Sequence, residues 1–286
     1  MPALPTDVPT PRTVAGWGPF LWTRVLFPPA PSPDTRVRLR SLLLVVLLPA
    51  ALLYPTLSFR LLEPDEGRYA QIPKELLDRG AWVVPTLQGE PYLDKPPLMY
   101  WLVRLSYAAF GVSEASARLV PAVCVHLTVL AVYLIGRRSV GERAALWAAL
   151  LLTVSPGYLG VARLLLLDGL LTLCVTLSVL CGYEAVRTGK LLVGWWVASA
   201  VASGLGFLTK GPISEVLLFP PLFAVGYLTP GIARVGWKPV AVFAGVVVGV
   251  NLPWYVGVYL DEPAFLRHFF WEHNVLRFVK PFDHLQ

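Results

Sequence analysis

A dense group of charged residues in the sequence PDEGRY directly follows a long apolar run. If this segment is helical, Asp65, Arg68 and Tyr69 share one face, because residues three and four apart are neighbours on a helix. The guanidinium of Arg68 would keep Asp65 ionised, which a general base requires. Asp65 and Glu66 also suit an ordinary helix start, where the helix dipole favours acids. The segment is therefore either a catalytic acid pair or an acidic first turn, and Pro73 predicts that the helix bends or ends early.

A lysine followed by two prolines stands in the sequence YLDKPPLMYW. The prolines form a rigid link into the apolar segment 98–110, which we expect to lie as a helix at the membrane interface. The link fixes Lys95 at the level of the lipid headgroups. Lys95 either extends toward those headgroups, as interfacial lysines do, or binds the phosphate of a substrate as a point charge.

Two more charged residues lie at breaks between apolar runs, in ARLLLLDGLLTL and FLTKGPI. Asp168 suits the start of a helix, as a cap or a first-turn acid, and Arg163 precedes it by five residues. Lys210 stands before a Gly-Pro pair, where it could simply mark the end of a helix. The functional alternative is that Asp168 and Lys210 are a second acid and a second cation, facing an anion held among the helix ends.

A last charged group lies near the end of the chain, in FFWEHNVLRF. The aromatic residues favour an amphipathic interfacial helix, and His273 and Arg277 share one of its faces. His273 could bind a divalent cation together with Asp94 or Glu272. No His-x-x-x-His or comparable metal spacing is present. A metal site is therefore one alternative, and the other is that no cofactor is required.

The composition places these residues in a membrane protein. Of the 286 residues, 56% are hydrophobic and 15% are charged, against about a quarter charged in soluble domains. The mean hydropathy is +0.61. Since backbone polar groups must be paired internally in lipid, apolar runs of roughly 20 residues predict spanning helices. We expect an all-α bundle of about seven spanning helices, over 41–59, 115–136, 142–160, 168–186, 191–209, 213–229 and 236–258.

The basic residues divide the chain between the two sides of the membrane. A Pro/Arg-rich tail and three short loops carry most of the excess of Lys and Arg, which predicts that they are cytoplasmic. This excess accounts for the net charge of +6 without a nucleic-acid partner. Every candidate named above falls on the other side. We therefore expect a multi-pass plasma (inner) membrane protein with a cytoplasmic N-terminus and an active site on its periplasmic or extracellular face. The expected divisions are the tail 1–40, the bundle 41–258 with its outer loop 60–114, and an outer interfacial segment 259–286.

These motifs together resemble a known family. The outer loop beginning DEGRYAQIPKELLDRG is similar to the first outer loop of the bacterial aminoarabinose transferases that act on lipid A, and of the related protein O-mannosyltransferase-like enzymes. Both are integral membrane glycosyltransferases of the GT-C type. The likeness covers about residues 40–280, and the motifs occur in the family's order: Asp-Glu-x-Arg-Tyr, Lys-Pro-Pro, ARLLLLD, GLGFLTKGP and PWYV followed by EHNVLRF.

The resemblance implies a GT-C helix bundle, a polyprenyl-phosphate sugar donor, and a lipid A-like, other envelope or protein acceptor. It implies that Asp65 of the Asp65-Glu66 pair is the essential acid or base and that Asp168 is the second outer acid. It assigns cations around the lipid phosphate to Arg68, Lys95 and Arg277, to which we add Lys210. Tyr69 and Arg163 are further candidates for substrate binding.

Two features depart from the family pattern. Asp94 stands where the family often has glutamate, and family members are commonly longer, with further helices and a C-terminal outer domain that this sequence lacks. The expected activity is inverting transfer of a sugar from the lipid phosphate. One alternative is a truncated, non-catalytic paralogue that binds polyprenyl phosphate. Another is a transporter of an anionic lipid, which would place charges at mid-membrane depth and contain repeats.

Overall fold

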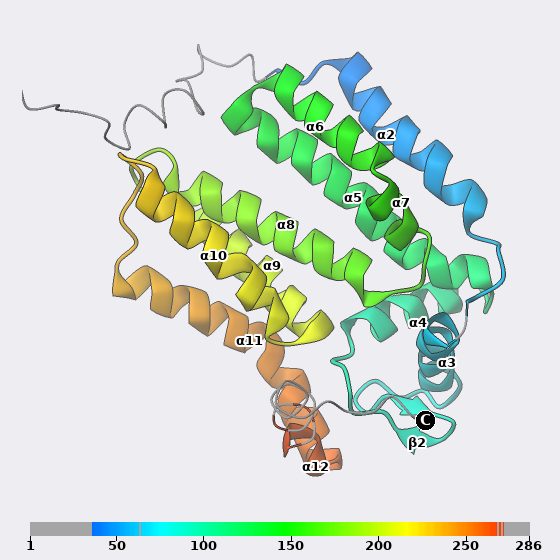
Figure 1. The fold of residues 1–286 in the computed structure, drawn as a ribbon. Helices are drawn as coiled ribbons and strands as arrows, with labels where there is room; N and C mark the ends of the chain where they lie inside the picture. The colour runs from blue at the N-terminus through cyan, green and yellow to red at the C-terminus, as the bar shows by residue number, and fades with distance from the viewer. Residues whose placement is uncertain (1–35, 63, 268, 270, 272–286) are drawn as a thin grey trace, which may run out of the picture.

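The computed structural model describes residues 36–62, 64–267, 269 and 271 and consists largely of helices (Figure 1). The long apolar helices lie side by side in a bundle, and the shorter elements of the outer loop lie across one end of it. The helices are α2 (Leu39–Leu53), α3 (Asp65–Asp78), α4 (Leu98–Phe110), α5 (Glu114–Val140), α6 (Glu142–Val154), α7 (Pro156–Ala162), α8 (Leu167–Val186), α9 (Val193–Lys210), α10 (Ile213–Leu228), α11 (Trp237–Asp261) and α12 (Ala264–Leu266), with a 3₁₀ turn at Tyr54–Thr56.

All seven segments predicted to span the membrane are helical. Four helices within the described residues are long and apolar enough to cross a bilayer: α2 with its 3₁₀ turn, α5, α8 and α11. The α6–α7 pair makes a fifth if it is counted as one bent span. α9 has 18 residues and α10 has 16, slightly fewer than the roughly 20 that a span requires. The all-α membrane fold is confirmed, whereas the count of seven spans stays a prediction.

The third predicted span, 142–160, is broken. α6 ends at Val154, α7 begins at Pro156, and the two helices are bent by 64°. Pro156 has no N–H to donate and disfavours a helical conformation at the residue before it. Ser155 accordingly has extended backbone angles, with φ −64° and ψ 122°. The break falls at Pro156, so the segment 142–160 consists of two helices and not of one continuous helix.

The outer loop contains α3, a short hairpin and α4. The hairpin pairs β1 (Thr86–Leu87) with β2 (Glu90–Pro91) in antiparallel register. Its two turn residues, Gln88 and Gly89, have positive φ angles of 56° and 86°, as a two-residue hairpin turn requires. α4 occupies the segment predicted as an interfacial helix.

The proline was predicted to bend α3 or to end it early. α3 continues through Pro73 to Asp78, so the second of these two outcomes is wrong. Ile72 and Leu76, on either side of the proline, are buried against Tyr100 of α4. This packing holds both halves of the helix and compensates for the hydrogen bond that the proline cannot make.

A buried apolar cluster joins the loop to the bundle. It contains Met99 and Val103 of α4, Ala117 of α5, and Leu167 and Leu170 of α8. Burial of such side chains stabilises the contact by roughly 1.5–3 kcal/mol for each large residue. The loop elements are therefore fixed over the ends of α5 and α8, where the charged candidates lie.

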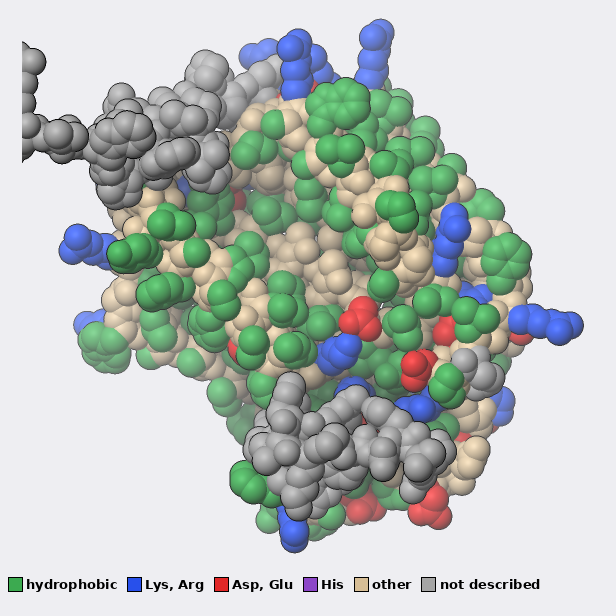
Figure 2. Space-filling model, viewed as in Figure 1, with side chains coloured by type: hydrophobic (Ala, Val, Ile, Leu, Met, Phe, Trp, Pro, Cys, Tyr) green, Lys and Arg blue, Asp and Glu red, His purple; other side chains and the backbone are tan. Residues whose placement is uncertain are grey.

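The basic loops gather at the opposite end of the bundle. Nε of Arg138 lies 3.0 Å from a carboxylate oxygen of Glu184, and Nε of Arg187 lies 2.6 Å from the other. The N–H of Ala233 donates to the carbonyl of Val186 at 2.8 Å, which joins the loop before α11 to the end of α8. Figure 2 shows Lys and Arg side chains at the upper and left edges of one face and mixed acidic and basic side chains on its lower part.

Candidate functional site

A buried ion pair holds the start of α3 in place. Nε and Nη2 of Arg118, on α5, each lie 2.8 Å from a different carboxylate oxygen of Glu66. Both side chains are 2% exposed. The same carboxylate accepts the N–H groups of Leu62 and Leu165, each at 2.7 Å. The carboxylate of Glu66 thus joins four parts of the chain: the segment that precedes α3, α3 itself, α5, and the loop that leads to α8.

The surroundings of Glu66 keep it ionised. Burial alone raises the pKa of this carboxyl, but the hydrogen bonds from Arg118 and from the Leu165 and Leu62 amides together lower it below its ordinary value. Arg118 also donates to the carbonyls of Phe59 and Arg60. Because the carboxylate oxygens of Glu66 are all engaged by protein donors, the geometry supports a positioning role for it rather than a direct role in chemistry.

Asp65, the neighbour of Glu66, points in a different direction. Its carboxylate is 58% exposed and lies 3.9 Å from Nη2 of Arg68. A hydrogen bond with Tyr92 raises the pKa of Arg68, and the charge of Asp65 contributes in the same direction. The helical face predicted for Asp65, Arg68 and Tyr69 is therefore present, with an accessible acid beside a permanently charged cation.

Charges from two separate segments act on Tyr69. Burial raises its pKa, and so do the charges of Asp65 and Asp168, whereas the charge of Arg68 lowers it. Burial raises the pKa of Tyr92 as well, and the nearby charge of Asp94 adds to this effect. Asp168 in the first turn of α8 thus affects the pKa of Tyr69, and Asp94 in the loop before α4 affects the pKa of Tyr92. Arg68 of α3 affects the pKa of both tyrosines.

Asp168 and Lys210 form an ion pair at this end of the bundle. Nζ of Lys210 lies 2.8 Å from Oδ1 of Asp168, and the two side chains are 31% and 46% exposed. Asp168 is in the first turn of α8 and Lys210 in the last turn of α9, which complements both helix dipoles. Asp168 is a first-turn acid and not the N-cap, which is Leu166. The pair is half-buried and in contact with solvent, and surface pairs contribute about 0–1 kcal/mol. The contact between Lys210 and Asp168 can therefore be exchanged for another at a modest cost.

Lys95 lies half-buried in the rigid link before α4. The flanking Leu93 and Leu98 pack against a cluster that includes Trp254 of α11 and Phe265 of α12. The prolines that follow Lys95 are buried. The link is thus anchored on both sides of Lys95.

Arg163 is not part of this group. It is exposed, and its Nη2 donates to the carbonyl of Leu52 in α2 at 3.1 Å. No described contact joins Arg163 to Asp65, Asp168 or Lys210. The structure therefore gives no support to a role for Arg163 in substrate binding.

The predicted metal ligands are only partly within the described residues. Glu272, His273 and the predicted phosphate ligand Arg277 lie outside them. Among the residues that the structure describes, no three or more His, Cys, Asp or Glu side chains are grouped so that they could hold a metal ion. Asp94 is instead close to Tyr92.

Sequence reasoning missed Arg118 and Tyr92. Arg118 stands within the first long apolar run after the outer loop, and a charged residue inside a predicted span is a signal for a partner or a site. That signal was available and pointed to an acid on a neighbouring segment. Tyr92 carries no such signal, because its role depends on how the loop folds against α3.

The fold and the site together define a class. The chain is an integral membrane helix bundle of the GT-C type, with a group of acids and cations built at the helix ends and covered by an outer loop. The sequence pattern of one family, described as dolichyl-phosphate-mannose-protein mannosyltransferase, matches residues 94–254. This is more than half of the chain, and the protein belongs to that family.

Similar proteins point to one branch of GT-C enzymes. An undecaprenyl phosphate-alpha-4-amino-4-deoxy-L-arabinose arabinosyl transferase of Pseudomonas fluorescens is 37% identical over 79% of this chain and 39% of its own length. A transferase of the same description from Pseudomonas savastanoi is 36% identical over 86% of this chain and 46% of its own. The chain spans less than half the length of these curated relatives.

A solved structure agrees with this assignment. The crystal structure of ArnT from Cupriavidus metallidurans bound to undecaprenyl phosphate matches with a TM-score of 0.71 and 27% identity. The match covers 83% of this chain and 45% of that chain. These similarities agree with the resemblance to the aminoarabinose transferases that the motifs indicated.

Proposed function

We propose that this chain transfers a sugar from a polyprenyl-phosphate donor to an acceptor at the end of the bundle that carries Asp168 and Lys210. The observation that carries the proposal is the half-buried Asp168–Lys210 pair at the end of the bundle where Asp65 and Arg68 also lie. Transfer from a lipid phosphate needs an acid for the acceptor and cations for the leaving group, and both kinds of group are present there.

In the proposed reaction the acceptor oxygen attacks the anomeric carbon of the sugar. The new carbon–oxygen bond forms as the bond to the phosphate oxygen breaks, so the configuration inverts. Asp65 accepts the acceptor's proton. The phosphate leaves without a proton, since its second pKa is about 6, and the cations stabilise the charge that it gains.

The proposed cations come from separate segments. Lys210 binds the phosphate by exchanging its contact with Asp168, and Arg68 holds Asp65 ionised while facing the same site. Lys95 and Arg277 are proposed as further phosphate ligands. Glu66 and Arg118 act through Asp65, because their pairing fixes the first turn of α3.

The proposed carrier and acceptor follow the relatives. Their names give undecaprenyl phosphate as the carrier and aminoarabinose as the sugar, and the matching crystal structure holds undecaprenyl phosphate. We therefore propose undecaprenyl phosphate as the carrier and a lipid A-like, other envelope or protein molecule as the acceptor. If the acceptor is itself a phosphate, it needs little deprotonation, and Asp65 orients it instead.

The proposed location is a plasma (inner) membrane, with the site on the periplasmic or extracellular side. The clustering of basic residues at the other end of the bundle supports this orientation, because positively charged loops stay cytoplasmic. The N-terminus is then also cytoplasmic.

A transfer assay in nanodiscs tests the proposal. The chain is offered radiolabelled undecaprenyl-phosphate sugars and a membrane extract as acceptor, and Asp65→Asn is compared with the wild type. Asp78→Asn is the matched control, since Asp78 is an exposed acid on the same helix that pairs with Lys74. Transfer that is lost only in Asp65→Asn supports the proposal, and full turnover by Asp65→Asn removes Asp65 from the mechanism.

The second candidate is a non-catalytic protein that binds the carrier. Binding of undecaprenyl phosphate that depends on Lys95, without transfer to any acceptor, would identify it. The transporter alternative has less support, because the charged residues gather at one end of the bundle.

A further inference from the structure

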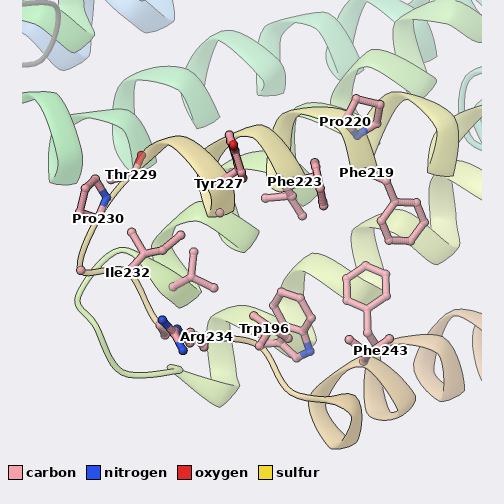
Figure 3. Close-up of a pocket in the computed structure, with 17 residues that line it drawn as sticks. Trp196, Phe219, Pro220, Phe223, Tyr227, Thr229, Pro230, Ile232, Arg234 and Phe243 are labelled. Carbon is pink, nitrogen blue, oxygen red and sulfur yellow. The ribbon is translucent and has the colours of Figure 1, made fainter. Parts of the chain in front are cut away.

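A second site lies at the basic end of the bundle, away from the charged group described above. A groove with a volume of about 1030 Å³ opens between α10, the loop 229–235 and the start of α11 (Figure 3). Trp196, near the start of α9, lines it, whereas Lys210 is at the other end of the same helix. At 1.5 Å per residue the two positions are about 20 Å apart along the helix axis. The groove is therefore separate from the proposed transferase site and does not depend on it.

One end of the groove is lined with aromatic rings. The ring centroids of Trp196 and Phe243 are 5.2 Å apart, and those of Phe219 and Phe243 are 6.4 Å apart. Nε1 of Trp196 donates to the carbonyl of Pro239 at 2.8 Å, so the polar atom of this ring is already paired. The aromatic end therefore presents apolar surface, and the indole N–H of Trp196 needs no hydrogen-bond partner from a ligand.

The side of the groove formed by α10 carries exposed aromatic residues. Phe223 and Tyr227 line the groove from α10 and are 77% and 82% exposed. In a bilayer, side chains of this kind face lipid tails. A lipid chain can thus enter from the side, between α10 and α11.

The other end of the groove carries a cation. Figure 3 shows Arg234 away from the rings of Phe219 and Phe243, and it is the charged residue among those that line the groove. Its side chain is exposed and makes no ion pair with the part of the chain that the structure describes. The neighbouring Arg187 and Arg138 are both paired with Glu184. Glu184 is thus already paired with two other arginines, and Arg234 is available to bind the anionic group of a ligand.

We propose that this groove binds a glycerophospholipid with an anionic headgroup, with an acyl chain between α10 and α11 and the headgroup phosphate at Arg234. An apolar groove that ends in a basic residue at the membrane surface matches the acyl chain and the anionic headgroup of such a lipid. A peptide fits less well, because its backbone would need hydrogen-bond partners that an apolar, lipid-facing groove does not supply.

Native mass spectrometry of the purified chain tests this site. The chain is titrated with equal amounts of dioleoyl phosphatidylglycerol and dioleoyl phosphatidylcholine, which share their acyl chains and differ in the headgroup, anionic in the first and zwitterionic in the second. We expect about fivefold more bound phosphatidylglycerol, the preference given by roughly one basic residue at a membrane surface. Arg234→Gln should bring the ratio of the two lipids to about one.

Two further variants test the apolar part of the groove. Gly226 lines the groove and has no neighbouring atom within 4 Å of a side chain built there. A Cβ at this position meets no neighbour, and the ring in Gly226→Phe should occupy the groove and lower the binding of both lipids. Gly249→Phe is the matched control, because Gly249 has equally open surroundings on α11 and does not line the groove.

The charge also has a matched control. Arg143 is exposed at the same end of the bundle, outside the groove, and has no ion pair among the described residues. Arg143→Gln should leave the lipid ratio unchanged, and a loss equal to that of Arg234→Gln would overturn the site in favour of general surface charge. Equal binding of the two lipids by the wild type would overturn it as well. Displacement of phosphatidylglycerol by undecaprenyl phosphate, in the wild type but not in Arg234→Gln, would reassign the groove to the carrier.

Discussion

Glu66 and Arg118 form a two-pronged ion pair that is almost completely buried, with two contacts of 2.8 Å. The pair joins residues 52 positions apart in the sequence. It fixes the turn that carries Asp65, and through the Leu165 amide it also fixes the loop before Asp168. Two acids that stand far apart in the sequence are thereby held at the same end of the bundle.

Removing one partner of this pair should destabilise the protein strongly. Arg118→Gln leaves the Glu66 carboxylate buried without its cation, and we expect a loss of about 3–5 kcal/mol in the free energy of unfolding. Unfolding in detergent with increasing denaturant measures this. Arg163→Gln serves as the control, because Arg163 is exposed and makes one hydrogen bond to Leu52. A loss below about 1 kcal/mol in Arg118→Gln would show that the pair does not hold α3.

The stability should fall in acid because of the same pair. The folded-state pKa of Glu66 lies below its ordinary value of 4.5. A carboxyl with a lowered pKa contributes stability that is fully present above the unfolded pKa and is lost as the pH falls through the folded pKa. The wild type should therefore lose stability below about pH 4.5 more steeply than Glu66→Gln, as followed by thermal unfolding between pH 3 and 7. Parallel pH profiles for the two proteins would contradict this account.

Glu75 should hold the hairpin of the outer loop against α3. Its carboxylate accepts hydrogen bonds from the Thr86 hydroxyl and the backbone N–H of Gln88, each at 2.8 Å, and from the backbone N–H of Gly89 at 3.2 Å. Glu75→Ala should speed hydrogen exchange of the Gln88 and Gly89 amides about tenfold, since a hydrogen bond to a charged group is worth roughly 1.5–3 kcal/mol. Mass-spectrometric exchange of the 86–91 peptide measures this. The same exchange rate in Glu75→Ala and in the control Asp78→Ala would show that Glu75 does not anchor the hairpin.

Lys210 should matter for activity and little for stability. Its pair with Asp168 is half-buried and in contact with solvent, so Lys210→Met should change the free energy of unfolding by no more than about 1 kcal/mol. If Lys210 binds the leaving phosphate, the rate of sugar transfer should fall about 100-fold or more. Kinetics and thermal unfolding of the same preparation separate the two effects. Lys74→Met is the control, because Lys74 also pairs with an aspartate at 2.8 Å but lies on α3 outside the site. Equal transfer rates in both variants would remove Lys210 from the reaction.

Hydropathy and residue spacing predict the class of the fold and most of the candidate residues. Long apolar runs permit only helices in lipid, and every segment predicted in this way is helical. Local rules also placed Asp65 beside Arg68 on one helical face, and Asp168 and Lys210 at helix ends. These predictions succeed because they depend on spacing along a single helix.

Packing between distant segments determines which charged residues contact one another and which are buried. Neighbouring residues Asp65 and Glu66 look alike in sequence, yet one is exposed and the other is buried against Arg118. Sequence grouped Arg163 with Asp168, but Arg163 instead contacts Leu52 of α2. Such differences depend on contacts between distant segments, and the packing of α3, α5 and α8 determines them. The persistence of α3 beyond Pro73 has the same origin, because burial against α4 outweighs the local preference of the proline.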